Sequence, residues 1–555
     1  MKFKLLIALT LVVSGIVSCK KGSDDPQPGG FEAITFKFGA DATSISIDQA
    51  TKTLKNMPRG TDVTQLVATA VLPAGFSISP DPTTPKDYTK TVTYTITNAQ
   101  GGKYTMQITV PVYDAVSNPY GVYNAKHLSG IRNGLNDSYV LINDIVLPDL
   151  TATDAAATVG ISDYATYGWY SIGTAYVNGG HVIFRGSLDG QNHTIKNLRS
   201  IFREGLDQPQ GIDAGHNGKS MDGLFGYAAH ATFKNIGIQL ASAGINGNSV
   251  SSGSYSPVGA LIGRADTCTF INCFVSGNGT ITGGQQVGGL IGRASYSNIS
   301  KCYSAIANQA GSFSINAFGD AGGLIGSAFN SEIIDSYSST SVLSAVNVGG
   351  LIGSISTSTV KTCYASGNVT ELQQNTTGGL IPFNALGGLI GSVSAVSPSN
   401  SLIQNSYATG SVSGANGSNI SFHQGSRIGG LIGQISNATT GPVSVTFCYA
   451  TGTVSRVHTS TVVPYLIGGL VGTTANNIFI SSSNCTNYWD KEKTGQTYLG
   501  GGNSALAQDN GFTTNGKTSS EMKTGSTFVN WDFSSVWIMS AGSNNGYPYL
   551  RSINR

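Results

Sequence analysis

Apolar and polar residues alternate in a repeated pattern through the middle of the chain. A glycine-framed apolar run recurs eight times within residues 222–488, as DGLFG, VGALIG, VGGLIG, AGGLIG, VGGLIG, LGGLIG, IGGLIG and IGGLVG. Its closing glycines are Gly226, Gly263, Gly292, Gly326, Gly353, Gly391, Gly433 and Gly472, so successive copies lie 27 to 42 residues apart. The shortest spacing suits one coil of a β-solenoid with three short strands, and the longer spacings leave room for loops on one side.

The second half of each repeat carries a small residue followed by an aromatic one. The small residues are Cys273, Cys302, Ser336, Cys363, Ser406 and Cys448, and the aromatic residues after them are Phe274, Tyr303, Tyr337, Tyr364, Tyr407 and Tyr449. Because strand side chains alternate between faces, the two sets must point in opposite directions. Small residues suit the narrow interior of a solenoid, so we expect the cysteines to point inward and the aromatic rings outward.

The cysteines can be read as disulfide partners or as small apolar fillers. Disulfides are common in exported proteins. Cysteine alternates with serine at this position, however, which indicates that the site requires a small side chain rather than a bond. We therefore predict free thiols at the four cysteines of the column, whereas Cys268 and Cys485 fall outside it. The leucine at the centre of each glycine-framed run should also be buried, with a glycine bend turning both it and its apolar neighbours inward.

The segments on either side of the repeats predict further elements. Residues 31–114 hold short β-rich runs separated by Pro and Gly, typical of a small β-sandwich. Residues 124–135 predict an amphipathic helix that Asn124 can N-cap and that can close the first coil of the array. Three of the four tryptophans lie in residues 489–555, which we expect to form an aromatic cap over the other end.

The first residues of the sequence resemble a bacterial lipoprotein signal. Lys2 and Lys4 precede an apolar stretch too short to span a bilayer, and this stretch ends in Ile-Val-Ser-Cys. The resemblance implies cleavage after residue 18 and lipidation of Cys19, the alternative being an ordinary secretory signal. Residues 19–30 predict a flexible tether, and their Lys-Lys-Gly-Ser-Asp-Asp stretch is similar to the signal that exports Bacteroidetes lipoproteins to the cell surface.

The repeats, together with the segment 184–198, resemble the GLUG-motif family. The module at residues 31–114 is similar to the Ig-like modules that follow the anchor in Bacteroidetes surface lipoproteins. These resemblances imply an all-β protein: an Ig-like β-sandwich, then a right-handed parallel β-helix over residues 116–488 with a short N-terminal capping helix and an aromatic C-terminal cap. They place the protein at the outer membrane, exposed at the cell surface, and imply no defined reaction.

Charge and catalytic motifs limit the possible functions. Charged residues make up 11% of the sequence, the net charge is +2, and no basic block indicates a nucleic-acid partner. Acidic residues in the repeats are scattered, although a β-helix polysaccharide lyase or glycoside hydrolase needs them clustered. The enzymatic candidates are Asp189 with His193, and Asp213 with His216, and both also suit structural turns. We expect no catalytic residue, metal or cofactor.

One remaining group could bind a ligand, namely the outward aromatic residues. We call Phe274, Tyr303, Tyr337, Tyr364, Tyr407 and Tyr449 the aromatic ladder. Regularly spaced rings can contact sugar rings, but they can also stack on one another and only stabilise the sheet. The sequence therefore favours a surface lipoprotein that binds a glycan or a host or matrix protein as an adhesin does. The polysaccharide-degrading enzyme and a structural stalk without a specific ligand are the alternatives.

Overall fold

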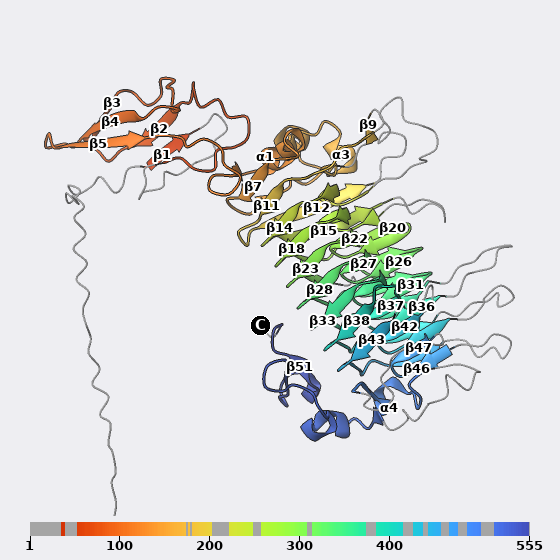
Figure 1. The fold of residues 1–555 in the computed structure, drawn as a ribbon. Coiled ribbons are helices and arrows are strands. Elements are labelled where there is room, and N and C mark those ends of the chain that lie inside the picture. Colours follow the sequence, from red (N-terminus) through yellow and green to blue (C-terminus); the bar gives the residue numbers. More distant parts are fainter. Residues whose placement is uncertain are drawn as a thin grey trace, which may run out of the picture. The chain divides into compact units, whose positions relative to one another are not determined.

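Figure 1 shows the fold of the protein in a computed structural model. The structure describes residues 35–38, 53–173, 176–177, 180–201, 221–247, 257–307, 313–372, 384–414, 426–436, 442–456, 466–474, 486–500 and 515–553. The chain forms two compact units. One comprises residues 1–55 and 61–112, and the other comprises residues 56–60 and 113–555.

The N-terminal unit is built from two antiparallel sheets. The first pairs β1 (Thr35–Phe38) with β2 (Ala68–Val71), and the second contains β3 (Ser77–Ser79), β4 (Val92–Thr97) and β5 (Lys103–Ile108). Period-two alternation buries Tyr94 and Ile96 of β4. The hydroxyl groups of Tyr94 and the buried Tyr88 lie 2.5 Å apart. The predicted all-β character of this segment is confirmed.

Short helices and strands begin the second unit. They are β6 (Tyr120–Val122), α1 (Ala125–Gly130), η2 (Ile131–Asn133), β7 (Ser138–Leu141), β8 (Ile145–Val146), α2 (Ala155–Val159), α3 (Tyr164–Tyr167) and the antiparallel pair β9 (Tyr176–Val177) and β10 (Gly180–His181). The Asn124 side chain caps α1 by accepting a hydrogen bond from the backbone N–H of His127, as predicted. The predicted helix is shorter than expected and continues as the 3-10 turn η2. Leu128 and Ile131 lie in the core that fills the first coils.

The rest of this unit is a parallel β-helix. Successive coils stack so that equivalent strands pair in parallel, for example Ile325 with Ile352 (Figure 1). One coil comprises β26 (Asp320–Gly322), β27 (Ile325–Phe329), β28 (Glu332–Ile334), β29 (Tyr337–Ser338) and β30 (Val342–Ser344). It therefore has five short strands rather than the predicted three, because a glycine bend and tight corners interrupt the faces of the coil.

Equivalent strands of successive coils build the sheets of the β-helix. The eight-stranded sheet contains β13 (Phe225–Ala229), β17 (Ile262–Asp266), β22 (Ile291–Ser295), β27, β32 (Ile352–Ser356), β37 (Ile390–Ser394), β42 (Ile432–Ile435) and β47 (Val471–Thr474). The ten-stranded sheet contains β6, β7, β11 (Ser187–Asp189), β14 (Thr232–Lys234), β18 (Thr269–Ile271), β23 (Asn298–Ser300), β28, β33 (Thr359–Lys361), β38 (Ser401–Gln404) and β43 (Val443–Thr446). The seven-stranded sheet contains β16 (Pro257–Val258), β21 (Gln286–Gly288), β26, β31 (Asn347–Gly349), β36 (Ala385–Gly387), β41 (Arg427–Gly429) and β46 (Leu466–Gly468).

The aromatic ladder lies on a fourth set of strands. This set comprises β12 (Thr194–Ile201), β15 (Gly237–Asn246), β19 (Phe274–Gly277), β24 (Tyr303–Ile306), β29, β34 (Tyr364–Ala365), β39 (Tyr407–Ala408), β44 (Tyr449–Ala450) and β48 (Tyr488–Asp490). The ladder residues themselves stand on the strands from β19 to β44. Beside them run β20 (Ile281–Gly283), β25 (Ile315–Ala317), β30, β35 (Val369–Glu371), β40 (Val412–Gly414) and β45 (Val454–Arg456).

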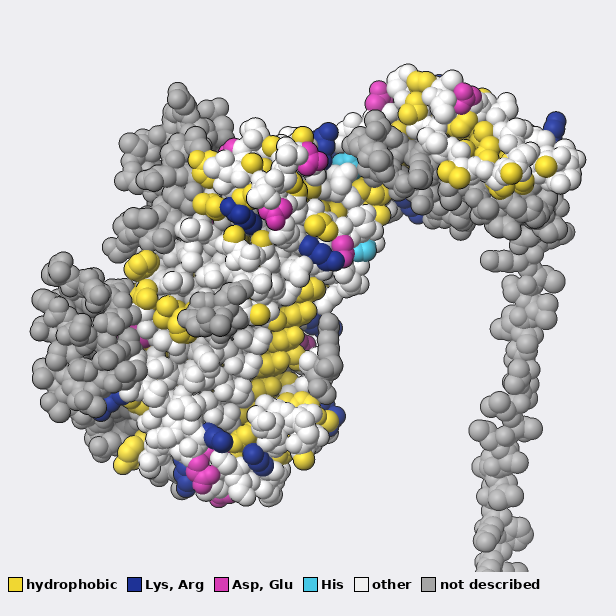
Figure 2. Space-filling view, turned by 180° about the vertical axis from the view of Figure 1, so that it is seen from behind, with side chains coloured by type: hydrophobic (Ala, Val, Ile, Leu, Met, Phe, Trp, Pro, Cys, Tyr) yellow, Lys and Arg dark blue, Asp and Glu magenta, His cyan; other side chains and the backbone are white. Residues whose placement is uncertain are grey.

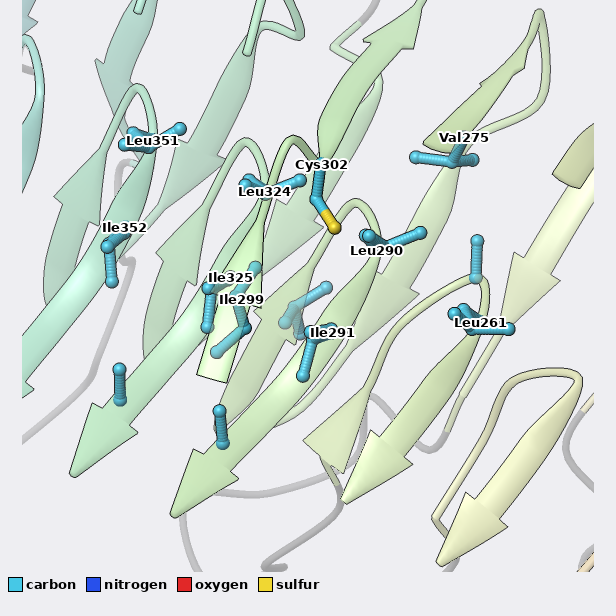
Figure 3. Close-up of a cluster of buried hydrophobic side chains, with 14 of the residues drawn as sticks. Leu261, Val275, Leu290, Ile291, Ile299, Cys302, Leu324, Ile325, Leu351 and Ile352 are labelled. Atoms are coloured by element: carbon cyan, nitrogen blue, oxygen red, sulfur yellow. The ribbon is translucent and has the colours of Figure 1, made fainter. Parts of the chain in front are cut away.

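The glycine-framed run buries its leucine and the next apolar residue together. Leu351 and Ile352 are both fully buried, and Figure 3 shows the same pairing in neighbouring coils. The backbone bends at Gly350 and Leu351, which separates β31 from β32. The glycines of the run are required because the coils pack closely, and not because the backbone there is left-handed. A Cβ atom on Gly353 would lie 2.5 Å from the backbone nitrogen of Ala321 in the preceding coil.

The cysteine column points into the β-helix, as predicted. Cys273, Cys302, Cys363 and Cys448 are completely buried and are free thiols. A corner of the coil, rather than strand alternation, turns these cysteine side chains inward. The residue before each column position has a left-handed backbone, with φ between 49° and 56° at Asn272, Lys301, Asp335, Thr362, Asn405 and Phe447. This corner turns the next side chain inward.

A second column at another corner accounts for Cys268. Its members are Cys268, Ser297, Ser331, Ser358 and Ser401. The backbone N–H of each of the first four donates to the serine hydroxyl of the next coil, at 3.0–3.2 Å. Cys268 is buried and free at the start of this column. Cys19 and Cys485 lie outside the described residues.

Cys363→Ser should change the free energy of unfolding by less than about 1 kcal/mol, because serine already occupies the same column at Ser336 and Ser406. The Ser406 hydroxyl donates to the carbonyl of Gln404 at 2.8 Å, and a serine at 363 can donate to Lys361 in the same way. Thermal unfolding followed by circular dichroism measures the change. Cys363→Leu is the comparison, since it overfills the interior and should be the more destabilising of the two. Equal losses in both variants would contradict the filler role.

The C-terminal residues close the β-helix and then cover one of its sides. Trp489 of β48 follows Ala450 in the inward column of the ladder strands and is fully buried. It plugs the interior. The remaining elements are α4 (Lys491–Thr494), β49 (Gly516–Lys517), η5 (Glu521–Lys523), η6 (Gly525–Thr527), β50 (Trp537–Ile538), η7 (Asn544–Gly546) and β51 (Tyr549–Leu550). We call residues 516–553 the C-terminal cap. Its tryptophans pack on the outside of the aromatic ladder.

Candidate functional site: an aromatic ladder half covered by the C-terminal cap

The aromatic ladder is a continuous stack of rings on the outer face of the β-helix. Neighbouring ring centroids, from Phe274 through Tyr449, lie 4.8–5.0 Å apart with interplanar angles of 2–7°. The spacing follows from the strand separation of a parallel sheet, because each ring stands on the strand after the last. Tyr488 continues the column by pairing with Tyr449 in β48.

The ring faces of the ladder are engaged within the ladder. Nearly parallel planes at this spacing give offset stacking, so each ring covers part of its neighbours' faces. The first ring is also covered: a Cβ atom on Gly237 would lie 2.4 Å from Phe274, so glycine there lets that ring pack on the preceding coil. A ligand therefore meets a row of ring edges and hydroxyl groups rather than the open flat faces on which sugar rings stack.

The C-terminal cap covers one half of the ladder. Tyr449 is fully buried, Tyr407 is 5% exposed and Tyr488 is 6% exposed. Trp537 lies with its ring centroid 6.0 Å from those of both Tyr407 and Tyr449, and Trp531 lies 6.2 Å from Tyr449. The prediction that the whole ladder faces solvent is therefore wrong for Tyr407 and Tyr449, because the apolar cap removes them from water.

Hydrogen bonds fix the cap on this half. The Tyr449 hydroxyl donates to the carbonyl of Pro548 at 2.5 Å and accepts from the side-chain amide of Asn544 at 2.7 Å. The Trp531 indole N–H donates to the carbonyl of Thr486 at 2.9 Å. Burial raises the pKa of Tyr449 well above its ordinary value. The covered half is thus a specific intramolecular interface.

The other half of the ladder remains accessible. Phe274, Tyr303 and Tyr337 are half-buried, and Tyr364 is half-buried at the border with the cap. Figure 2 shows a continuous hydrophobic stripe along the β-helix that reaches the C-terminal part. The side chains next to it are mostly uncharged. This accessible half is our candidate binding surface.

The first catalytic candidate, Asp189 with His193, is separated into two ion-pair groups. Asp189 pairs with Lys234 at 3.1 Å and accepts a hydrogen bond from Asn235. His193 instead lies 3.4 Å from Asp144, which also pairs with Lys196 at 2.7 Å. The hydrogen bond from Lys196 is the main cause that lowers the pKa of Asp144 to about 2. These contacts fit structural ion pairs, and the other candidates, Asp213 and His216, lie outside the described residues.

The acidic residues of the repeats do not converge. Asp320 accepts hydrogen bonds from the Asn347 amide at 2.7 Å and the Ser354 hydroxyl at 2.5 Å. Burial is the main cause that raises the pKa of Asp320. Glu371 accepts from Asn384 and Ser426, in a different part of the coil. Within the described residues, no group of three or more His, Cys, Asp or Glu side chains could hold a metal ion.

Comparisons with known proteins match parts of the chain. Residues 33–112 match the protein-family model described as SGBP, N-terminal, the N-terminal domain of surface glycan-binding proteins. Halomucin of Haloquadratum walsbyi (strain DSM 16790 / HBSQ001) is 33% identical over 194 residues, which are 34% of this chain. The chain spans only 2% of the length of halomucin. Within the described residues, no helix is both long and apolar enough to cross a membrane.

Two solved structures align with most of the chain. A candidate immunoglobulin A1 protease from Bacteroides ovatus is 17% identical, with a TM-score of 0.35, over 79% of this chain and 93% of that one. A second structure, named IgA1 Protease, is 14% identical, with a TM-score of 0.38, over 78% of this chain and 29% of that one. These similarities are too distant to assign an activity, and the family match covers residues 33–112 alone.

Proposed function

We propose that this protein is a non-catalytic, glycan-binding protein of the bacterial cell surface, held at the outer membrane through a lipid on Cys19. The observation that carries the proposal is the accessible half of the aromatic ladder. It offers a straight row of ring edges and tyrosine hydroxyl groups, repeated every 4.8–5.0 Å on a rigid scaffold. Such a row can make many weak contacts with an extended polymer, through hydrogen bonds to hydroxyl groups and apolar contacts to ring edges.

The N-terminal unit supports a glycan as the polymer. Residues 33–112 match the N-terminal domain model of surface glycan-binding proteins. The low proportion of charged residues also fits a hydroxyl-rich glycan better than a nucleic acid. In this proposal the N-terminal unit serves as a spacer, and the β-helix carries the binding surface along its length.

A protein partner is the second candidate, and one observation favours it. The ladder already binds a polypeptide, since Trp531 and Trp537 of the C-terminal cap pack on Tyr449. An adhesin that binds aromatic side chains of a host or matrix protein would use the accessible half in the same manner. A glycan remains the first candidate because the family match names glycan-binding proteins.

The test is binding of the mature full-length chain to a glycan array and, in parallel, to matrix proteins. A Tyr303→Ala, Tyr337→Ala double variant should lose at least about tenfold in glycan affinity, because it interrupts the row of contacts away from the cap. Tyr303→Phe with Tyr337→Phe keeps the stack and removes two hydroxyl groups, so its affinity should be intermediate.

Tyr296→Ala is the matched control. Tyr296 is 59% exposed and contacts Phe329 rather than the ladder, so its loss should leave glycan binding unchanged. Binding to matrix proteins alone would favour the protein partner. If the wild-type chain binds neither glycan nor protein, the structural stalk becomes the better description.

A further inference from the structure

A small hollow near the start of the β-helix lies apart from the aromatic ladder. It has a volume of about 80 Å³, and its polar lining comes from Asp149, Tyr164, Asn197, Arg199 and Ser242. These residues belong to the turn after β8, to α3 and to the adjacent strands β12 and β15. The volume has room for a carboxylate and the atoms next to it, but a whole sugar residue would extend outside.

An interruption of the strand pairing creates the hollow. Between the pairs Leu198–Leu240 and Ser200–Ile245, the single residue Arg199 of β12 faces four residues of β15. Two left-handed residues accompany the bulges, Asn197 with φ 64° and Gly244 with φ 65°. Bulges of this kind redirect side chains and are frequent beside functional sites. The bulge exposes the hollow next to Arg199.

Arg199 is held in place, but the Nε–H of its guanidinium lacks an acceptor among the described residues. Its carbonyl accepts a hydrogen bond from the backbone N–H of Trp169 at 2.7 Å. Gly168, with φ 76°, leaves space for it, since a Cβ atom there would lie 3.2 Å from Cγ of Arg199. The Nε atom of Arg199 is buried without a hydrogen-bond acceptor among the described residues. A buried N–H without an acceptor costs free energy, so this guanidinium N–H is not stabilised by a protein partner within the described part of the chain.

A carboxylate on the same hollow leaves this guanidinium unpaired. Asp149 lines the hollow with Arg199, yet in the described part of the chain the two form no ion pair within 4 Å. Asp149 is exposed, and among the described residues its carboxylate accepts only long contacts of 3.4 Å, from Thr151. The hollow thus separates a strong donor from a strong acceptor. A ligand that bridges them must carry an acceptor anion at one end and a hydroxyl donor at the other.

We infer that this hollow binds an acidic sugar, a uronate whose carboxylate accepts hydrogen bonds from Arg199 and whose hydroxyl group donates to Asp149. Arginine forms paired, charge-assisted hydrogen bonds with carboxylates, which gives the site both strength and geometry. Asn197 and Ser242 add neutral hydrogen-bonding groups for the remaining hydroxyls. The inference deepens the proposed glycan-binding function and rests on it for the sugar, but it uses none of the ladder residues.

The experiment is a ligand-observed NMR titration of the mature full-length protein with glucuronate, glucose and acetate. Glucuronate should bind the wild type at least tenfold more tightly than glucose or acetate. Arg199→Gln should weaken glucuronate binding at least tenfold, and Asp149→Asn should reduce the preference for glucuronate over acetate. Arg293→Gln is the matched control, because Arg293 is half-buried in β22 and outside the hollow. Unchanged thermal unfolding midpoints verify that each variant folds.

The possible outcomes distinguish a failure of the inferred hollow from a failure of the proposed function. Equal glucuronate binding by the wild type and Arg199→Gln overturns the site, whatever the glycan array shows. Acetate binding as tight as glucuronate overturns the sugar and leaves a simple anion site. Glucuronate binding that depends on Arg199, combined with a blank glycan array, supports the hollow while the ladder proposal fails. If glycan-array binding depends on the ladder and glucuronate does not bind, the ladder proposal is supported and the hollow is overturned.

Discussion

Gly353→Val is expected to destabilise the central coils by several kcal/mol, roughly 4 or more. A Cβ atom at this position would lie 2.5 Å from the nitrogen of Ala321 and 2.5 Å from the carbonyl oxygen of Gly326. Both atoms belong to the backbone of the preceding coil, so no side-chain rotation relieves the overlap. The coils would have to separate, which breaks parallel strand pairing on both sides of the substitution.

Thermal unfolding by circular dichroism should show a lower midpoint for this variant, and hydrogen exchange should locate the loss of protection in the coils that contain Gly326 and Gly353. Gly542→Val is the matched control, since no heavy atom lies within 4 Å of a Cβ built there. A Gly353→Val chain with wild-type stability and exchange would show that the coils can move apart without cost, contrary to the packing described.

Trp537→Ala is expected to detach much of the C-terminal cap from the ladder, with a loss of about 3–5 kcal/mol in the stability of that interface. Trp537 is fully buried, and its ring lies 4.4 Å from Trp531 and 6.0 Å from Tyr407, measured between centroids. Its removal leaves a large cavity between the cap and the ladder. Water then reaches Tyr407 and Tyr449.

Limited proteolysis should cleave the cap of this variant faster than that of the wild type, and hydrogen exchange in β39 and β44 should increase. Val529→Ala serves as the control within the cap, because Val529 is 60% exposed. Cleavage of Trp537→Ala at the wild-type rate would mean that hydrogen bonds such as that from Trp531 to Thr486 hold the cap without the buried ring.

The repeated pattern was sufficient to predict the β-helix, because the same few residue types return at each coil and each coil can bury them only against its neighbours. Cysteine and serine alternate at one position, and this identified an inward site that requires a small side chain. The structure confirms free, buried thiols at Cys273, Cys302, Cys363 and Cys448. It also shows that the residue before each cysteine or serine of this column is a left-handed corner. Asn272, Asp335 and Asn405 carried a signal for this corner in the sequence, whereas Phe447 did not.

The candidate sites depended on contacts between residues distant in the sequence. Asp189 and His193 are close in sequence, but their partners, Lys234 and Asp144, come from other strands. The hollow beside Arg199 depends on the register between β12 and β15 and on the position of α3. Neither α2 nor α3 was predicted, since five-residue and four-residue helices carry too little periodicity to detect.

The sequence by itself determined the stacked coils, the inward small residues and the outward aromatic ladder, because these follow from short-range patterns that repeat with the coil. Only the tertiary structure decided which part of the ladder is accessible. The C-terminal cap lies more than 100 residues after Tyr407, and its apolar rings bury Tyr407, Tyr449 and Tyr488 while leaving Phe274, Tyr303 and Tyr337 half-exposed. Which ladder residues are covered depends on where a non-repeated segment packs, and the periodicity of the sequence does not predict that position.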